Sequence, residues 1–419
     1  MATDVPLTIM QTDLLTSLDT ARFLHQLVDN HEDLLTRDDS PALYVGTGGS
    51  MLLYAHLFVA TGDNRYAHSL YSLLDKAVTY LRERVMDTSL VGGFTGVGWL
   101  LQHLATLNLI DEDADTFTHL DGLVSQSVEL DIRMRYYELM NGLVGKGLYC
   151  LSRGGVMDDT LRRVVEGLVQ TADHRPEGLT WRYYGQAEER YSLGLSHGIP
   201  GVIAFLSRLL TRSFMPHIVR PLLIDTIRWL LSQENQAGQE RHFPRFVPDR
   251  DPSRLGWCYG DMGVAIALWP AAQALNDDVL RQKAIQIMLT AAQCSVDQSG
   301  ISMHPRWVDG AFCHGVAGIA HLFNRFYRAT GDCRFDDAAR HWLQLLLQSA
   351  ACDSAGPYST FRTLIHVNNA YDEQDRPIIE WKTLPTLLDG LSGIGLVLLS
   401  FAYPDVTDWD APFLTDVHR

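Results

Sequence analysis

In Gly260-Asp261-Met262-Gly263-Val264-Ala265-Ile266-Ala267-Leu268, two glycines three residues apart stand directly before an apolar run. A segment that is apolar on nearly all sides is typical of a fully buried helix. The glycines suit its first turn, because a backbone without Cβ atoms permits tight turns and close approach to neighbouring chain. The stretch therefore predicts a buried helix that starts at a crowded turn.

The same Gly-x-x-Gly element recurs seven times, each time before an apolar run. Its first glycines are 47 to 75 residues apart and stand at Gly46, Gly93, Gly142, Gly198, Gly260, Gly315 and Gly390. A segment with only one apolar face precedes each pair; in residues 334–350, Phe335, Ala338 and Trp342 recur at helical spacing while Asp337 and Arg340 face away. Long-period repeats of this kind indicate a repeat architecture.

Seven alternations of a half-exposed and a buried helix predict an all-α fold, an α/α toroid of seven inner and seven outer helices. An open solenoid is the alternative, but it needs polar capping repeats at its ends, and the sequence contains none that we recognise. We expect one toroid domain over residues 1–419. Aromatic and β-branched residues predict small strand-rich elements within 172–193, 236–255, 296–312 and 352–384.

Composition narrows the class of protein. The formal net charge of −16 disfavours non-specific binding to nucleic acid or anionic lipid, so we expect no nucleic-acid partner. No apolar run approaches the roughly 18 residues that span a bilayer, and the N-terminus lacks the pattern of a signal peptide. We therefore expect a cytoplasmic protein, in which the six cysteines are thiols or metal ligands rather than disulfides.

Three residues next to the repeat glycines form a candidate metal site. Cys258 and Cys313 each lie two residues before a first glycine, and His314 lies one residue before Gly315. Two thiolates and an imidazole are the ligand set of a zinc ion that keeps one coordination position open. The alternative is that both cysteines are buried apolar residues and His314 a core histidine. Their common register in adjacent repeats favours the metal site.

The ligand set also indicates the chemistry. Two cysteinates balance the charge of Zn²⁺, so a third thiolate, from a substrate, would remain nucleophilic, and a coordinated thiol is deprotonated at neutral pH. Thiol alkylation or addition therefore fits this set better than peptide hydrolysis.

Four further residues are candidates for catalysis at the same rim. His197 precedes Gly198 as His314 precedes Gly315, so it is placed to move protons, with helix capping as the alternative role. Arg254 could stabilise an oxyanion or be an ordinary surface arginine. Tyr259 could assist through its hydroxyl or pack as an aromatic residue, and Glu138 is a rim carboxylate.

Three motifs resemble the signature elements of the lanthionine synthetase C-like family. They are Gly194-Leu195-Ser196-His197-Gly198-Ile199-Pro200-Gly201, Trp257-Cys258-Tyr259-Gly260 and Phe312-Cys313-His314-Gly315, and they occur in the order found in that family. The resemblance extends to Leu388-Asp389-Gly390-Leu391-Ser392-Gly393 and so covers nearly the full length.

The resemblance implies a toroid with one zinc ion per chain at its mouth, held by Cys258, Cys313 and His314. The implied reaction is the Michael addition of peptide cysteine thiols to dehydroalanine or dehydrobutyrine, which forms lanthionine rings in antibiotic biosynthesis. The implied partner is a dehydrated precursor peptide with a leader and a Ser/Thr/Cys-rich core. A dehydratase and an exporter are further expected partners, which would place the protein peripherally on a membrane-bound complex.

By the same resemblance, His197 and Arg254 would protonate and stabilise the enolate, and Tyr259 follows the first zinc cysteine as in the family. Glu138 stands where the family usually has an aspartate that pairs with the catalytic histidine. The aspartate side chain is one methylene shorter than that of Glu138. The alternatives are addition of glutathione to dehydrated residues and a zinc-containing peptide-binding scaffold without turnover. An α/α-barrel glycosidase is a weaker alternative, because we find no convincing pair of rim carboxylates beyond Glu138 and Asp261.

Overall fold

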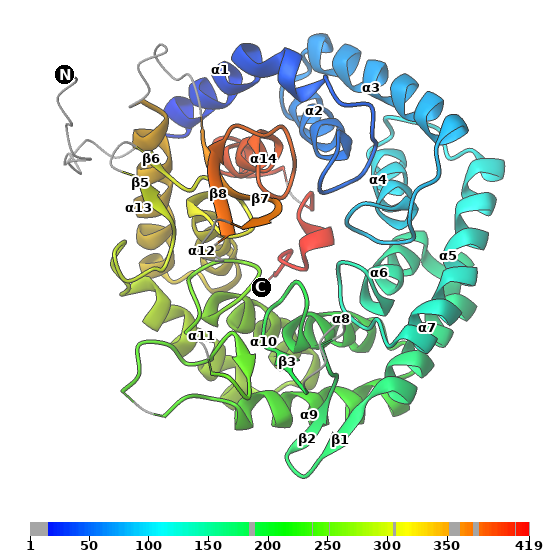
Figure 1. Ribbon diagram of the computed structural model, residues 1–419, viewed down its shortest axis with the longest axis vertical. Helices are drawn as coiled ribbons and strands as arrows, with labels where there is room; N and C mark the ends of the chain where they lie inside the picture. The colour runs from blue at the N-terminus through cyan, green and yellow to red at the C-terminus, as the bar shows by residue number, and fades with distance from the viewer. Residues whose placement is uncertain are drawn as a thin grey trace.

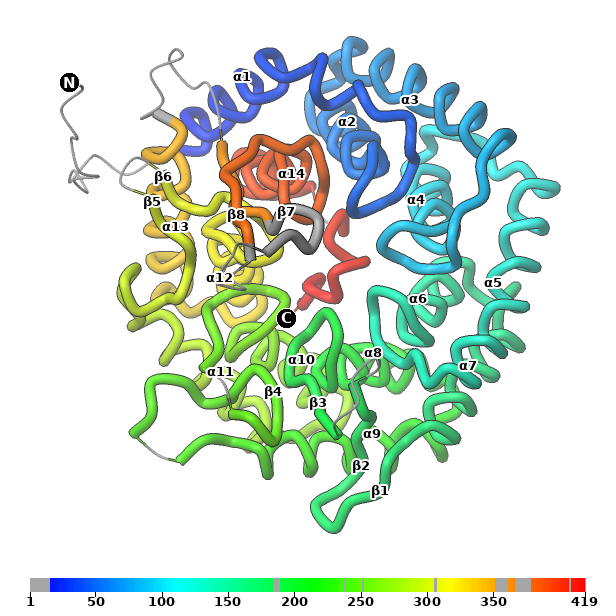
Figure 2. The backbone as a smooth tube through the Cα atoms, in the orientation of Figure 1, coloured from blue at the N-terminus to red at the C-terminus, as the bar shows by residue number. Residues whose placement is uncertain are grey.

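Two concentric rings of helices make up the protein in its computed structural model (Figure 1). The structure describes residues 16–183, 189–236, 238–250, 252–304, 307–351, 361–371, 377–406 and 408–418. The chain runs once around the ring, alternating between outer and inner helices from α1 (Ser17–Leu35) to α14 (Leu391–Ala402) (Figure 2). The prediction of an α/α toroid is confirmed.

The inner ring begins at the Gly-x-x-Gly pairs, as predicted. In the described part of the chain its helices are α2 (Gly48–Thr61), α4 (Phe94–Thr106), α6 (Leu143–Arg153), α8 (Ile199–Thr211), α10 (Asp261–Leu275), α12 (Val316–Thr330) and α14. Every residue of α10 from Asp261 to Trp269 is buried. Because each large apolar side chain removed from water stabilises the fold by about 1.5–3 kcal/mol, this layer is the main source of stability.

The outer ring consists of amphipathic helices. They are α1, α3 (Asn64–Glu83), α5 (Ala114–Met134), α7 (Asp158–Thr171), α9 (Pro216–Ser232), α11 (Asp278–Ala292) and α13 (Cys333–Ala351). In α13, Phe335, Ala338 and Trp342 are buried and Asp337 and Arg340 are exposed, as the helical spacing predicted. Aspartate side chains cap several of these helices; the Asp113 carboxylate accepts a hydrogen bond from Thr116 N at 2.9 Å.

The ring is closed. Each inner helix packs against the next, α14 packs against α2, and α1 lies outside α14 (Figure 1). A closed ring leaves no face of the inner layer open, which excludes the open solenoid and explains why no capping repeats are needed. Among the described residues, no helix combines the length and the apolar character needed to cross a membrane.

A turn of constant shape explains the first glycine of every pair. A Cβ atom at this position would lie 2.2 to 2.3 Å from the carbonyl oxygen six residues earlier, far inside van der Waals contact. These oxygens belong to Ser40, Asp87, Tyr136, Ser192, Arg254, Asp309 and Leu384. The glycines are therefore required by close backbone approach at the rim, which we define as the end of the ring where the inner helices begin.

Backbone hydrogen bonds connect the repeats along this rim. They join residues that lie two positions before the first glycine, from Cys258 N to Cys313 O (3.3 Å), Cys313 N to Leu388 O (2.9 Å), Leu388 N to Tyr44 O (3.1 Å), Tyr44 N to Val91 O (3.2 Å) and Val91 N to Met140 O (3.1 Å). Residues far apart in the sequence but in the same register are therefore neighbours in space.

Short antiparallel strand pairs lie in the loops between helices. The described pairs are β1 (Asp173–Arg175) with β2 (Gly178–Thr180), β3 (Tyr191–Ser192) with β4 (Phe246–Val247), β5 (Met303–His304) with β6 (Trp307–Val308), and β7 (Thr363–Tyr371) with β8 (Pro377–Lys382). Of the stretch 352–384, in which we expected strands, residues 352–360 and 372–376 lie outside the described residues, and so does Cys352.

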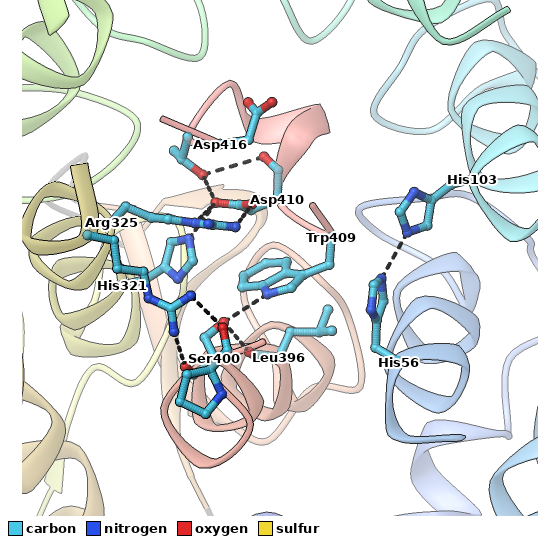
Figure 3. Close-up of polar contacts among 12 residues, drawn as sticks. His56, His103, His321, Arg325, Leu396, Ser400, Trp409, Asp410 and Asp416 are labelled. Atoms are coloured by element: carbon cyan, nitrogen blue, oxygen red, sulfur yellow. Dashed lines mark hydrogen bonds and ion pairs between the residues drawn. The ribbon is translucent and has the colours of Figure 1, made fainter. Parts of the chain in front are cut away.

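The C-terminal segment, residues 408–418, turns into the centre of the ring (Figure 1). Asp410, fully buried, accepts hydrogen bonds from His321 Nε2 (2.7 Å), Arg325 Nε (2.8 Å) and Thr415 Oγ1 (2.7 Å) (Figure 3). Phe413 is also fully buried, and its carbonyl oxygen accepts a hydrogen bond from Trp257 Nε1 at 2.9 Å. The segment is therefore buried beneath the rim and is not a solvent-exposed tail.

A pair of histidines faces the same interior (Figure 3). His56 Nε2 lies 2.9 Å from His103 Nε2, and burial lowers the pKa of His56 to about 3 and that of His103 to about 4. Both rings are therefore neutral at pH 7. His56 Nδ1 is buried and has no hydrogen-bond partner in the part of the chain that the structure describes. We therefore assign the proton to His56 Nε2, which leaves an acceptor rather than a donor unpaired.

Candidate metal centre and active site

Cys258 and Cys313 lie side by side because the rim hydrogen bonds join their repeats. Trp257 N and Cys258 N both donate to Cys313 O, at 3.2 and 3.3 Å, and the two thiol groups hydrogen-bond to each other. The hydrogen bond from Cys313 outweighs burial and, with the positive charges of Arg254 and His314, lowers the pKa of Cys258 to about 5. The same bond and burial raise the pKa of Cys313. Cys258 is therefore the thiolate of the pair.

Arg254 supplies positive charge beside this thiolate. Its Nη2 atom lies 3.6 Å from Cys258 Sγ. Burial works against the charged guanidinium, but the charge of Cys258 and the hydrogen bond to it, together with the charges of Cys313 and Asp309, outweigh burial and raise the pKa of Arg254. A cavity of about 480 Å³ opens next to it, lined in part by Arg241, Arg245 and Arg250. Arg254 itself lines this cavity, so the residue that contacts Cys258 Sγ forms part of the cavity wall.

His314 is oriented by a buried carboxylate. Its Nε2 atom lies 3.2 Å from Asp309 Oδ2, and Asp309 is itself held by Ala311 N and Thr363 Oγ1, both at 3.1 Å. Burial lowers the pKa of His314, but the hydrogen bond to Asp309 and the charges of Asp309 and Asp389 raise it to about 9. With Nε2 engaged, the Nδ1 atom is the one that faces Asp389, 3.6 Å from its Oδ1.

These groups form a cluster that could hold a metal ion. The ligand atoms of Cys313, His314 and Asp389 all lie within 4.8 Å of one another, and Cys258 joins them through its contact with Cys313. Among the described residues, the buried Asp389 Oδ1 atom has no hydrogen-bond partner and meets only the His314 ring, 3.6 Å from Nδ1, so it could also accept a cation. A carboxylate that orients the second nitrogen of a histidine is also common at metal sites, so the donor set fits a metal.

His197 and Glu138 form a second unit on the same rim. His197 Nδ1 lies 3.1 Å from Glu138 Oε2, and the carboxylate also accepts hydrogen bonds from Met140 N (2.6 Å) and Asn141 N (2.9 Å). Burial raises the pKa of Glu138, but these partners, His197 first, lower it below its ordinary value. Burial likewise opposes the charged form of His197, yet Glu138 and, to a smaller extent, Cys258 raise the pKa of that histidine.

Tyr259 lies between the two units. Its ring is 5.4 Å from that of Phe246, and a Cβ atom added at Gly194 would fall 2.7 Å from its Cδ1. Burial raises the pKa of the Tyr259 hydroxyl, so it is protonated throughout the neutral range. A hydrogen bond also links the units, because the Ser196 hydroxyl donates to the backbone carbonyl oxygen of Cys258 at 3.3 Å.

Comparison with known proteins identifies the family of the chain. Residues 37–414 match the family model described as lanthionine synthetase C-like protein. The chain belongs to the lanthionine synthetase C-like family. The resemblance read from the three motifs is thereby confirmed.

Individual relatives of this lanthionine synthetase C-like chain are distant but extensive. The nisin biosynthesis protein NisC of Lactococcus lactis subsp. lactis is 22% identical over 330 residues, which cover 70% of this chain and 75% of the relative. LanC-like protein GCL1 of Arabidopsis thaliana is 23% identical over 350 residues, or 77% and 76%. The solved structure of nisin cyclase has the same fold, with a TM-score of 0.68 at 19% identity over 95% of this chain and 97% of that one.

Two acidic residues of this lanthionine synthetase C-like site were missed by sequence reasoning. Asp389 stands directly before Gly390, the register that His314 and His197 occupy in their own repeats, so the repeat could have identified it. Asp309 stands six residues before Gly315, as Arg254 does before Gly260. Cys150, by contrast, lies inside α6, fully buried, where burial raises its thiol pKa.

Proposed function

We propose that this chain is a zinc-dependent cyclase that forms lanthionine and methyllanthionine rings by adding peptide cysteine thiols to dehydroalanine or dehydrobutyrine. The observation that carries the proposal is the cluster of Cys258, Cys313 and His314 on one rim with the His197–Glu138 pair. It is a donor set for thiol activation beside a proton donor. Membership of the family supports the same reaction.

Cys258, Cys313 and His314 would hold the zinc ion. Bound there, zinc would supply the charge that keeps the substrate thiol deprotonated at neutral pH. Asp309 engages His314 Nε2 and so leaves Nδ1, which faces Asp389, as the nitrogen that would meet the ion. Arg254, 3.6 Å from Cys258 Sγ, offsets the negative charge that the sulfur atoms accumulate.

His197 would complete the addition. The substrate thiolate forms a bond to the β-carbon of the dehydro residue, and the electron pair of the carbon–carbon double bond moves to form an enolate. Glu138 favours the charged form of His197 by raising its pKa, and the charged His197 then gives the proton on Nε2 to the α-carbon. His197 takes up a new proton from solvent. The substrate thiol released one proton to solvent when it was activated, so the overall reaction neither consumes nor releases a proton.

The substrate in this proposal is a dehydrated precursor peptide with a leader and a Ser/Thr/Cys-rich core. The cavity of about 480 Å³ beside Arg254 is where we place its approach to the sulfur atoms. The printed name of the Lactococcus relative, a nisin biosynthesis protein, supports a role in making an antibiotic peptide. A dehydratase that supplies the substrate and an exporter that removes the product are the partners that this role implies.

The experiment compares wild-type protein with Cys313→Ala, using Cys333→Ala, an exposed cysteine on α13, as the control. Zinc content is measured, and a dehydropeptide that contains one cysteine is incubated with each protein and with glutathione. Ring formation leaves the peptide mass unchanged and blocks alkylation of its cysteine. We expect this product with wild type and Cys333→Ala but not with Cys313→Ala.

Other outcomes would replace the proposal. A mass increase of one glutathione would show intermolecular addition instead of cyclisation. Binding of the peptide without any thioether would indicate a scaffold. If Cys313→Ala formed rings as well as wild type does, the reaction would not depend on the metal site.

A further inference from the structure

The cavity beside Arg254 has a charge opposite to that of the protein as a whole. Over the whole chain, Asp and Glu outnumber Lys and Arg by 50 to 34. The residues that line the cavity reverse this balance, because they include one acidic residue, Glu240, and four arginines, Arg241, Arg245, Arg250 and Arg254. A hollow lined by one sign of charge concentrates ligands of the other sign. The cavity therefore favours an anionic ligand.

Arg241 is held in the cavity wall by neutral groups. It is 9% exposed and donates hydrogen bonds to the carbonyl oxygens of Ser253 (3.2 Å), Glu240 (3.2 Å) and Gln298 (2.5 Å). Carbonyl oxygens satisfy N–H groups without neutralising the guanidinium charge. The buried Asp261 feels this charge, but it accepts two backbone amides of its own and does not line the cavity. The positive charge of Arg241 thus acts on the cavity.

The other two arginines of the wall, Arg245 and Arg250, are exposed to solvent. Arg250 Nη1 donates to Asn235 Oδ1 at 3.0 Å. The Arg245 guanidinium lies 5.4 Å from the ring centre of Phe246 and 5.9 Å from that of Tyr259. The planar fork of a guanidinium matches a carboxylate, and a side chain that is already positioned loses less entropy when it binds one. A carboxylate is therefore the anion that suits these side chains.

Arg254 connects the cavity to the sulfur atoms of the metal cluster. It lines the cavity, and its Nη2 atom lies 3.6 Å from Cys258 Sγ. An extended chain advances about 3.3–3.6 Å per residue, so a peptide with its cysteine at the cluster would place a residue only a few positions away in the cavity. The carboxylate and the reacting thiol can therefore belong to one peptide.

We propose that the arginine-lined cavity binds an acidic side chain of the substrate peptide, aspartate or glutamate, a few residues from the reacting cysteine. The proposal rests on the proposed function, which supplies the peptide and its cysteine. A peptide with a neutral amide at this position would leave the arginines without a charged partner. The cavity would thereby select which cysteine of a peptide reaches the metal cluster.

The test measures binding of fluorescent peptides to the full-length protein by anisotropy. One set carries Glu at successive positions on either side of a serine that replaces the cysteine, and a matched set carries Gln. Without the thiol, binding depends on neither metal nor turnover. The double variant Arg245→Gln/Arg250→Gln is compared with wild type and with Arg220→Gln, which changes an exposed arginine on α9 outside the cavity.

Wild type and Arg220→Gln should bind the best Glu peptide about tenfold more tightly than its Gln counterpart, because hydrogen bonds between charged groups are the stronger ones. The double variant should lose most of this preference, and added salt should weaken it in wild type. A preference that is unchanged in the double variant, or wild-type binding that is equal for both sets, would overturn the proposal.

A second variant moves the affinity in the opposite direction, which a folding defect would not do. Glu240→Gln removes the acidic side chain from the cavity and keeps the carbonyl oxygen that Arg241 uses. It should bind the Glu peptide more tightly than wild type does and leave the affinity for the Gln peptide unchanged. A weaker affinity for the Glu peptide would contradict the proposal.

Two further measurements separate the remaining outcomes. Inorganic phosphate and glutarate are added as competitors, and displacement of the Glu peptide by either anion at an affinity equal to that of the peptide would show a site for small anions instead. If the preference for Glu is observed but no rings form in the cyclisation assay, the proposed function fails and the assignment of the cavity stands. If rings form without any preference for Glu, the assignment of the cavity fails alone.

Discussion

His197 Nδ1 lies 3.1 Å from an oxygen of Glu138, and that carboxylate is completely buried. The backbone amides of Met140 and Asn141, the side-chain amide of Asn141 and the imidazole itself all hold it in place. The longer glutamate side chain therefore reaches the histidine without leaving its own loop. Because Nδ1 is engaged by Glu138, Nε2 is the nitrogen of His197 that the proposed reaction would use.

The first prediction concerns the dependence of rate on pH. Glu138→Gln removes the charge that raises the pKa of His197, while burial continues to lower it. If His197 acts as a general acid, the fall in rate at alkaline pH should move to lower pH, with a loss of about 100-fold at neutral pH. The kcat profile of Glu138→Gln against wild type checks this, and an unshifted alkaline limb would contradict it.

The second prediction concerns stability. The pKa of His197 is raised on folding, so the folded state binds the proton more tightly than the unfolded state. The stabilisation is fully present below the unfolded pKa of about 6.5 and is lost as pH rises through the raised pKa. The difference in unfolding free energy between wild type and His197→Asn should shrink across that interval. A difference that grows with pH would show that the sign is wrong.

The third prediction tests the C-terminal segment. Asp410→Asn removes the buried charge that pairs with Arg325 and His321. Breaking one partner of a buried pair costs about 3–5 kcal/mol, because the remaining guanidinium stays buried. Denaturant unfolding should show this loss, whereas Asp332→Asn, in an exposed pair with Arg334, should lose no more than about 1 kcal/mol. Equal losses would mean that the segment contributes little.

The fourth prediction links this segment to the metal centre. Phe413 lies 4.1 Å from Phe312 and 5.0 Å from Trp257, ring to ring, and these residues directly precede Cys313 and Cys258. Phe413→Ala should cost about 3–5 kcal/mol and also weaken zinc binding. Phe335→Ala, equally buried but between α12 and α13, should cost a similar stability and leave zinc affinity unchanged. Chelator competition separates the two effects, and equal zinc affinities in both variants would contradict the link.

The fold was predictable from local pattern. Glycine pairs before apolar runs are visible in the sequence. Because every pair forms the same turn, residues at equivalent positions in adjacent repeats are neighbours in space, and the sequence alone therefore predicts that Cys258 and Cys313 lie together. Asp389 obeys the same register and was overlooked because an aspartate before a glycine is common in loops.

The C-terminal segment could not have been predicted in this way. Asp410 is fixed by His321 and Arg325, more than 80 residues earlier on α12, and no local pattern pairs them. A charged residue near the end of a chain usually indicates a solvated tail, because burial is costly without a partner. The partners of Asp410, which are His321 and Arg325, become evident only from the closed ring, because they lie at its centre.

The most direct test of the central claim measures free thiol on a dehydropeptide incubated with protein stripped of metal and then given zinc. The account predicts that the peptide cysteine becomes inaccessible to alkylation, at unchanged mass, only when zinc and the protein are both present. A cysteine that remains open to alkylation with zinc-loaded protein, or rings that form equally well without zinc, would contradict it.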